Sequence, residues 1–295
     1  MISGAFAAAA TPLREGGTEL DEAAFEPLLQ FLVDRGLSGI LALGTTGEGI
    51  ALSLAERQRV AELYIRLAPR DFHVLVHCGA QTTAETVSLA AFAAEQGAAG
   101  IAVIAPPYFP LDERALFGHF LEAARACAPT PFYVYELERA SGYAVAPSVI
   151  LRLRESAPNL AGLKVSDTPW ERFAPYLIDG LDVFVGAEGL IDRALAAGAA
   201  GAVSALATAF PEAVVEAVRT GDEASTQALA ELRASVEGFP RHSALKYVLA
   251  KRGVPVRDDV RAPLRPLTED ERRDVDSLFP RWAELAGLDS ELAAR

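Results

Sequence analysis

Lysine is scarce in this 295-residue sequence, which contains three lysines and twenty-four arginines. One of the three, Lys164, lies at the end of the apolar run Leu160–Val165. Arginine supplies the same positive charge, so a lysine at the end of a buried strand indicates a need for an amine. A deprotonated amine attacks a carbonyl carbon, whereas a guanidinium does not. Lys164 is therefore a candidate Schiff-base nucleophile, and a buried ion-pair partner is the alternative.

Cysteine is also scarce, and runs of basic residues are absent. Cys78 and Cys127 have no metal-like spacing, which predicts two buried thiols in a reducing compartment. The formal net charge of −13 comes without the clusters of Lys and Arg that nucleic acids or anionic membranes require. The N-terminal segment shows no basic leader and no apolar stretch of membrane-spanning length. We expect a cytoplasmic protein that acts on small molecules, without nucleic-acid or membrane partners.

Eight short apolar runs recur along the chain, with longer amphipathic stretches between them. The runs are continuously apolar, as are strands of a parallel sheet that is covered on both faces. Ser53 and Asp112 precede two of the amphipathic stretches as capping residues. This alternation predicts an α/β fold, the (β/α)8 or TIM barrel. A doubly wound open sheet is the alternative, although no glycine-rich fingerprint follows the first run. The predicted strands are Gly4–Ala10, Gly39–Leu43, His73–Cys78, Gly100–Ala105, Pro131–Tyr135, Leu160–Val165, Asp182–Gly186 and Gly201–Ala205.

The strand pattern stops near Gly221, and the remaining residues show helical spacing. We therefore expect a catalytic barrel over residues 1–221 and a C-terminal helical appendage over residues 222–295. Such an appendage closes a face of the barrel or forms an oligomer contact, and the sequence does not choose between these. Its predicted helices are Glu223–Glu237, Ser243–Arg252 and Thr268–Ala286.

The loop Gly44–Gly49 directly follows the second predicted strand. Active residues of a (β/α)8 barrel lie at the C-terminal ends of its strands and in the loops that follow. The glycines let backbone N–H groups approach a ligand, and Thr45 and Thr46 add hydroxyls. The loop is thus a candidate site for a carboxylate or phosphate. A tight turn that caps the next helix is the alternative interpretation.

Tyr135 ends the fifth predicted strand as Lys164 ends the sixth, so both side chains would face one mouth of the barrel. A phenol has an ordinary pKa of about 10, and a positive iminium nearby favours its phenolate. Tyr135 would then be a usable acid and base beside the amine. A half-buried aromatic without a chemical role is the alternative.

Four further residues receive a structural interpretation. Lys246 and Lys251 lie in one helical stretch and are predicted to be solvated cations. His73 and His77 share a strand face at spacing four, but no third ligand stands at a suggestive spacing. We therefore expect polar lining there and no metal site.

Taken together, these residues resemble the family of dihydrodipicolinate synthase and N-acetylneuraminate lyase, the pyruvate-dependent class I aldolases and lyases. The resemblance runs from Gly4 to about Phe279. Its most specific marker is the Gly44-Thr45-Thr46-Gly47-Glu48 loop followed downstream by Gly162-Leu163-Lys164. Further markers are Thr11-Pro12-Leu13, Pro106-Pro107-Tyr108, Tyr135, Gly186 and Gly201-Ala202-Val203-Ser204.

The resemblance implies a role for each central residue. Lys164 would condense with the C2 ketone of a 2-oxo acid, and the iminium would act as an electron sink for the C3–C4 bond. Tyr135 would move the proton at the C4 oxygen and would be hydrogen-bonded by Thr46. No metal or organic cofactor would be needed, and the family suggests a homotetramer. The residues implied for substrate binding are Thr45, Thr46, Gly47, Gly186 and Val203.

The segment after Tyr135 departs from the family pattern, in which this strand usually reads Tyr-Asn-x-Pro. Ala140 stands where the synthases have an arginine that binds the carboxylate of the incoming aldehyde. Arg139 is one place off and is expected to point elsewhere. Glu136 and Glu138 place negative charge near the mouth, which would favour a hydroxylated or cationic group on the second substrate. The alternative is that both are rim carboxylates without a role.

Two other positions differ from the family. The loop that carries Tyr108 is one residue shorter than the usual Pro-Tyr-Tyr form, so Tyr108 matches either of two family tyrosines. One of those reaches into the neighbouring subunit's site and completes the proton relay. His77 replaces a small residue at the end of the third strand and is predicted to narrow the pocket.

We therefore predict a Schiff-base class I aldolase or lyase that makes or breaks the C3–C4 bond of a 2-oxo acid. The expected substrate is a 2-keto-3-deoxy sugar acid or a 4-hydroxy-2-oxo acid. A Schiff-base dehydratase of a keto-deoxy sugar acid is the nearest alternative, and 4-hydroxy-tetrahydrodipicolinate synthase is the next. From another class, a non-catalytic 2-oxo-acid-binding protein stays open.

Overall fold

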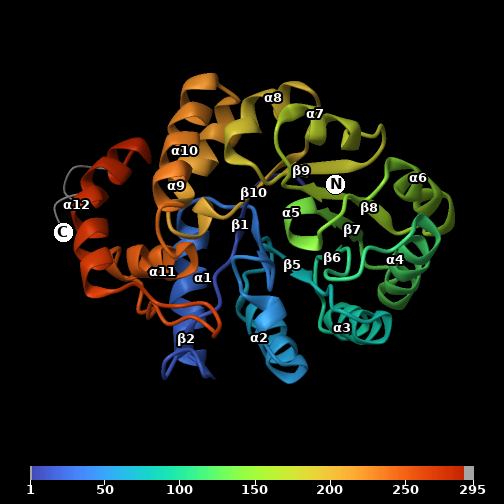
Figure 1. Cartoon of the computed structure of the whole chain (residues 1–295), viewed down its shortest axis with the longest axis horizontal. Helices are drawn as coiled ribbons and strands as arrows, with labels where there is room; N and C mark the ends of the chain where they lie inside the picture. Colours follow the sequence, from blue (N-terminus) through green and yellow to red (C-terminus); the bar gives the residue numbers. More distant parts are fainter. Residues whose placement is uncertain (1, 289–295) are drawn as a thin grey trace.

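Eight parallel strands close into one barrel in the computed structural model, which describes residues 2–288 (Figure 1). The barrel strands are β1 (Gly4–Ala8), β4 (Gly39–Ala42), β5 (His73–His77), β6 (Gly100–Ile104), β7 (Phe132–Glu136), β8 (Leu160–Val165), β9 (Asp182–Val185) and β10 (Gly201–Ser204). A short antiparallel pair, β2 (Leu13–Arg14) and β3 (Glu19–Leu20), follows β1. The predicted barrel is confirmed, and the open sheet is wrong because β1 pairs with both β4 and β10.

Helices follow the barrel strands and cover them on the outside (Figure 1). The Ser53 hydroxyl accepts a hydrogen bond from the Glu56 N–H, and the Glu56 carboxylate accepts one from the Ser53 N–H. This capping box starts α2 at the predicted residue. Asp112 caps α4 by accepting from the Ala115 N–H at 2.8 Å. The helices around the barrel are α1 (Phe25–Asp34), α2 (Leu54–Leu67), α3 (Thr83–Glu95), α4 (Glu113–Cys127), α5 (Glu138–Ser141), α6 (Pro147–Ser156), α7 (Trp170–Phe173), α8 (Ile191–Ala196) and α9 (Pro211–Thr220).

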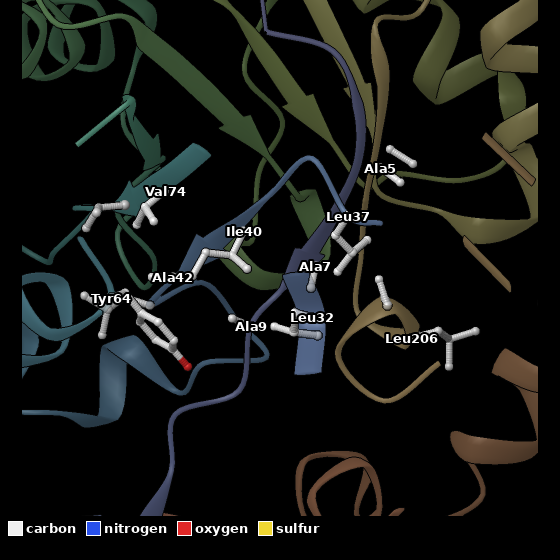
Figure 2. Close-up of a cluster of buried hydrophobic side chains, with 14 of the residues drawn as sticks. Ala5, Ala7, Ala9, Leu32, Leu37, Ile40, Ala42, Tyr64, Val74 and Leu206 are labelled. Carbon is white, nitrogen blue, oxygen red and sulfur yellow. The ribbon is translucent and has the colours of Figure 1, made fainter. Parts of the chain in front are cut away.

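Strand residues alternate between two apolar layers. Phe6 and Leu41 belong to the cluster that fills the barrel interior. Their neighbours Ala7 and Ile40 belong to the outer layer, where they meet helix residues such as Leu32 (Figure 2). Both faces of the sheet are covered, and this explains why the strands read as continuous apolar runs. Cys78 and Cys127 are buried free thiols, as predicted.

Three helices follow the barrel: α10 (Glu223–Val236), α11 (Arg241–Lys251) and α12 (Glu269–Leu285). They match the predicted C-terminal helices within two residues at each end. Trp282 of α12 packs edge-on against Phe210 and Phe239, with ring centroids 6.5 and 5.9 Å apart. The buried Arg252 guanidinium, just after α11, lies 2.6 Å from the Glu212 carboxylate on α9. These contacts hold the helical region against the barrel, where its side chains reach the catalytic mouth.

Candidate active site

Lys164 and Tyr135 are register partners on the neighbouring strands β8 and β7. The Lys164 amine lies 4.0 Å from the centroid of the Tyr135 ring and donates a short hydrogen bond to the Ser166 hydroxyl. The Tyr135 hydroxyl lies 3.1 Å from Oγ1 of Thr45. Lys164 is 7% exposed and Tyr135 is 2% exposed. An amine, a phenol and an alcohol therefore stand in contact at the C-terminal ends of the strands.

The surroundings of Tyr135 act on its acidity in two directions. Burial raises the pKa of the phenol, because the phenolate loses its hydration. The positive charge of Lys164 and the hydrogen bonds from Thr45 and Lys164 outweigh burial and hold the pKa of Tyr135 below its ordinary value. The phenol is thus a better proton donor than a free tyrosine, and its phenolate is accessible as a base.

The Lys164 side chain lines a cavity that opens to solvent. A Cβ atom at Gly186 would lie 2.9 Å from the Lys164 Nζ, so a glycine keeps the space beside the amine free. Of the residues predicted from the sequence, those that line the cavity are Thr45, Thr46, Tyr135, Lys164, Gly186 and Val203.

The threonine loop differs from the prediction in two respects. Thr45 bonds the Tyr135 hydroxyl, so the predicted bond from Thr46 is wrong. Gly47 does not line the cavity, because its carbonyl accepts a 2.6 Å hydrogen bond from Thr11 and the glycine packs against the end of β1. The direction of each side chain in a tight turn depends on local backbone angles that the spacing of residues does not report.

Glu136 is turned away from the cavity, although it was predicted to bind substrate. It follows Tyr135 on β7, and successive strand residues point to opposite faces of a sheet. Its side chain is buried, and Oε2 accepts a 2.9 Å hydrogen bond from the Val145 N–H. Burial and then the neighbouring Asp167 carboxylate raise the pKa of Glu136 to about 9, against the opposing hydrogen bond from the Val145 N–H. The acid is neutral near pH 7, so the negative charge expected from it at the mouth is absent.

Glu136→Gln is expected to stabilise the protein increasingly as the pH rises from about 4.5 to 9. In that window the unfolded chain loses the Glu136 proton and the folded chain keeps it, so the wild type loses stability with rising pH. Glutamine keeps the shape without titrating. We expect a gain of roughly 2–4 kcal/mol at pH 8 and little gain at pH 4. Urea unfolding at both pH values measures this, and a gain of equal size at both would contradict it.

His77 lies beside Tyr135. Its ring meets the Tyr135 ring edge-on, with centroids 5.7 Å apart, and Nδ1 lies 3.0 Å from the Leu43 carbonyl oxygen. Burial and then the positive charge of Arg57 lower the pKa of His77 to about 3, so the ring is neutral. His77 does not line the cavity that holds Lys164, so a narrowing of the substrate pocket by His77 stays a prediction. His77 borders an apolar cavity that shares Gly44, Thr45 and Tyr135 with the Lys164 cavity. The apolar cavity is also lined by Ile50, Ile104, Pro107 and Leu264.

Tyr108 does not reach the cavity of its own chain. Its side chain is 84% exposed and packs edge-on against Phe109, with ring centroids 4.8 Å apart. Its backbone φ is +82°, a left-handed value that is uncommon for residues other than glycine. A catalytic role for Tyr108 stays a prediction, and it requires a second copy of the chain.

Three arginines line the cavity that holds Lys164. Arg139 comes from α5, so the expectation that it points elsewhere is wrong. Arg233 comes from α10 and Arg241 from α11, and neither belongs to a local motif that could have revealed it. Arg233 lies 3.1 Å from Glu188, and both Arg233 and Arg241 pair with Glu237, at 2.7 and 3.1 Å. The site therefore carries more positive charge than the sequence indicated.

Lys246 is fully buried, so the prediction that it is a solvated cation is wrong. Its Nζ lies 2.5 Å from Oε1 of Glu48, and neither side chain is exposed. Glu48 also accepts a 2.7 Å hydrogen bond from the Arg261 N–H. Lys251, predicted in the same way, forms a partly exposed ion pair with Asp276 at 2.7 Å.

The buried pair connects α11 to the loop of Thr45. Glu48 has a left-handed backbone, with φ of +56°, in the turn that follows Thr45. One turn before Lys246 on α11, His242 Nε2 lies 2.9 Å from the Thr45 carbonyl oxygen. The C-terminal helical region thus fixes the loop that carries the hydroxyl bonded to Tyr135.

No metal-binding cluster of three or more His, Cys, Asp or Glu side chains occurs in residues 2–288. Within the same range, no helix combines the length and the apolar character that a membrane span needs.

A buried lysine on a barrel strand, with a phenol in contact and a cavity beside it, is the arrangement of an enzyme that forms a Schiff base with a carbonyl substrate. Comparisons with known proteins agree. The dihydrodipicolinate synthetase family model matches residues 1–280. The chain is 32% identical to 4-hydroxy-tetrahydrodipicolinate synthase of Thermus thermophilus, over 98% of this chain and 97% of the relative.

Two solved structures are similar over nearly their whole length. YagE, a prophage protein of the dihydrodipicolinic acid synthase family from E. coli K12, solved with pyruvate, has a TM-score of 0.89 and 25% identity, over 96% of this chain and 99% of YagE. N-acetylneuraminate lyase of Proteus mirabilis has a TM-score of 0.84 and 26% identity, over 95% and 98%. The chain belongs to the dihydrodipicolinate synthetase family. It is a pyruvate-dependent class I aldolase or lyase that acts through a lysine Schiff base.

Proposed function

We propose that the chain cleaves or forms the C3–C4 bond of a 4-hydroxy-2-oxo acid, including the 2-keto-3-deoxy sugar acids. The contact chain from Lys164 through Tyr135 to Thr45 is the observation that carries this proposal. It places a nucleophile and a proton carrier side by side, and aldol cleavage needs both.

In the cleavage direction, the Lys164 amine adds to the C2 ketone, and water leaves as the iminium forms. The Tyr135 phenolate removes the proton of the C4 hydroxyl, the C3–C4 bond breaks, and its electrons move into the iminium to give an enamine. An aldehyde leaves. Protonation of the enamine at C3 and hydrolysis of the imine then release pyruvate and restore the amine. Thr45 holds the phenol in position throughout.

We propose that Thr45 and Thr46, with the amides of their loop, bind the carboxylate of the 2-oxo acid. Both residues line the cavity that holds the Lys164 amine. Hydroxyl and backbone N–H donors at a glycine-rich turn suit an anion. Gly186 and Val203 line the same cavity, and the absence of a side chain at Gly186 leaves room beside the amine for the C2 and C3 atoms.

We also propose that the enzyme is a homotetramer, in which Tyr108 enters a neighbouring subunit's site. The exposed aromatic pair Tyr108 and Phe109 supports an interface of this kind, because large exposed apolar side chains mark contact surfaces. Cytoplasmic location stays a prediction.

An assay of products separates this function from the dehydratase and from the non-catalytic binding protein. The enzyme is incubated with a panel of 4-hydroxy-2-oxo acids and 2-keto-3-deoxy sugar acids, and both pyruvate and remaining substrate are quantified. Pyruvate and aldehyde in equal amounts support the proposal. Loss of substrate with a dehydrated product and no pyruvate points to the dehydratase. No turnover together with saturable binding of 2-oxo acids points to the binding protein.

Tyr135→Phe is expected to lower kcat for cleavage by about 10²–10⁴-fold, because it removes the proton carrier and leaves Lys164 in place. The pyruvate adduct with Lys164 should still form, more slowly. Steady-state kinetics and reductive trapping measure the two effects. Tyr133→Phe is the matched control, since Tyr133 lies two residues earlier on the same strand in the barrel interior. Equal losses in both variants would contradict a proton-transfer role for Tyr135.

A further inference from the structure

Positive charge gathers on one side of the cavity. A second, more open hollow adjoins it and shares four lining residues with it: Arg139, Ser166, Gly186 and Arg233. Glu188 and Glu237 also line this hollow, whereas Arg241 lines only the cavity that holds Lys164. The threonine loop does not line this hollow. A substrate whose carboxylate lies at Thr45 and Thr46, and whose C2 lies at Lys164, would therefore extend past Ser166 and Gly186 toward the arginines.

The arginines outnumber the carboxylates around them. Glu188 forms an ion pair with Arg233, and Glu237 forms ion pairs with both Arg233 and Arg241. Oε1 of Glu188 also accepts hydrogen bonds from the Ser204 hydroxyl and the Leu206 N–H. Arg139 forms no ion pair within the part of the chain that the structure describes.

These cations also repel one another. Burial lowers the pKa of Arg241, and the charges of Arg233 and Arg139 lower it further. Among residues 2–288, the buried Nε atom of Arg241 has no hydrogen-bond partner. Cations crowded together and partly removed from water are stabilised when an anion lies between them.

We propose that Arg139, Arg233 and Arg241 form a subsite for a second anionic group, a carboxylate or a phosphate, on the part of the substrate that leaves as the aldehyde. This inference rests on the proposed function and adds the charge of the second half of the substrate. It reverses the sequence-based expectation of a cationic or hydroxylated group, because Glu136 is buried and neutral and Glu138 pairs with Arg172.

The chemistry of the three side chains suits such a group. A guanidinium offers several N–H donors in one plane and binds carboxylates and phosphates through paired hydrogen bonds. The adjoining hollow opens to solvent, so an anionic group can enter it from outside. A substrate with a neutral end would leave Arg139 without a counter-charge.

Reductive trapping tests the subsite without requiring turnover. The concentration of 2-oxo acid that gives half-maximal borohydride adduct is measured by intact mass. One pair of probes is 2-oxoadipate and 2-oxohexanoate, which have equal length and differ in the terminal carboxylate. The other is a 2-keto-3-deoxy sugar acid with and without a terminal phosphate. In at least one pair, we expect the half-maximal concentration of the charged probe to be about 10–100-fold lower than that of the uncharged probe. The pair that shows this difference identifies the anion.

The ratio of the half-maximal concentrations of the uncharged and the charged probe measures the subsite. Arg139→Gln and Arg241→Gln should each reduce this ratio toward one. Arg139 is exposed, so its variant should fold even if the Arg241 variant does not. Arg172→Gln is the matched control and should keep the ratio, since Arg172 does not line the cavity. A ratio near one in the wild type for both pairs, or an unchanged ratio in Arg139→Gln, would overturn the subsite. Pyruvate trapping separates the two proposals, because failure to trap pyruvate refutes the Schiff base itself.

Discussion

Lys164→Met is expected to reduce kcat/KM for 2-oxo acid cleavage by roughly 10⁴–10⁶-fold, as loss of a covalent nucleophile does in other enzymes. Methionine has a similar length and fills the same buried space, although it removes the hydrogen bond to Ser166 and the positive charge beside Tyr135. The fold should therefore remain, as circular dichroism and the unfolding midpoint can verify. Steady-state kinetics with the substrate found in the product assay measures the loss.

The scarcity of lysine supplies a good control for this experiment. Lys251→Met removes another of the three lysines, one whose pair with Asp276 is partly exposed. Its activity should stay within about twofold of the wild type, as is usual for surface substitutions. An active Lys164→Met variant would show that the amine is not the nucleophile. A loss of similar size in Lys251→Met would show that removing any lysine inactivates the protein.

Lys246→Met is expected to lower the free energy of unfolding by about 3–5 kcal/mol, the cost of leaving a buried charge without its partner. The Glu48 carboxylate would remain with no exposure and would keep only the Arg261 N–H as a hydrogen-bond donor. Burial lowers the pKa of Lys246 although the Glu48 carboxylate acts to raise it, because the buried ammonium has lost hydration. Urea unfolding of the wild type and the variant measures the difference.

Adding Glu48→Gln to Lys246→Met should recover part of that loss, because the double variant removes both buried charges. A loss below about 1 kcal/mol in Lys246→Met would contradict the account of this pair. Because Glu48 lies in the turn after Thr45, we also expect a lower kcat in Lys246→Met that Glu48→Gln does not restore. A thermal midpoint that falls while kcat stays unchanged would show that the pair stabilises the fold without positioning the loop.

The barrel and the contact between Lys164 and Tyr135 could be predicted because they depend on the order of strands. Parallel strands have their carboxyl ends at one edge of the sheet. Residues at the ends of neighbouring strands therefore lie close together, independently of the helices that connect the strands. Lys164 and Tyr135 are register partners for this reason. The same alternation of strand residues places Glu136 on the face opposite to Tyr135, so its position outside the cavity was also predictable from the sequence.

The rest of the site depends on packing between distant segments. Arg233 and Arg241 reach the cavity from helices that begin after the last barrel strand, and local spacing does not report where those helices lie. Lys246 did carry a signal, since Leu245, Val248 and Leu249 on the same helix are buried apolar residues. A lysine among such neighbours is more consistent with a buried ion pair than with a solvated cation.

Borohydride reduction in the presence of pyruvate tests the central claim most directly. The account predicts a single pyruvate adduct per chain by intact mass, located on the peptide that contains Lys164. The adduct should be absent from Lys164→Met and present in Lys251→Met. No adduct in the wild type, or an adduct that persists in Lys164→Met, would contradict the Schiff-base mechanism.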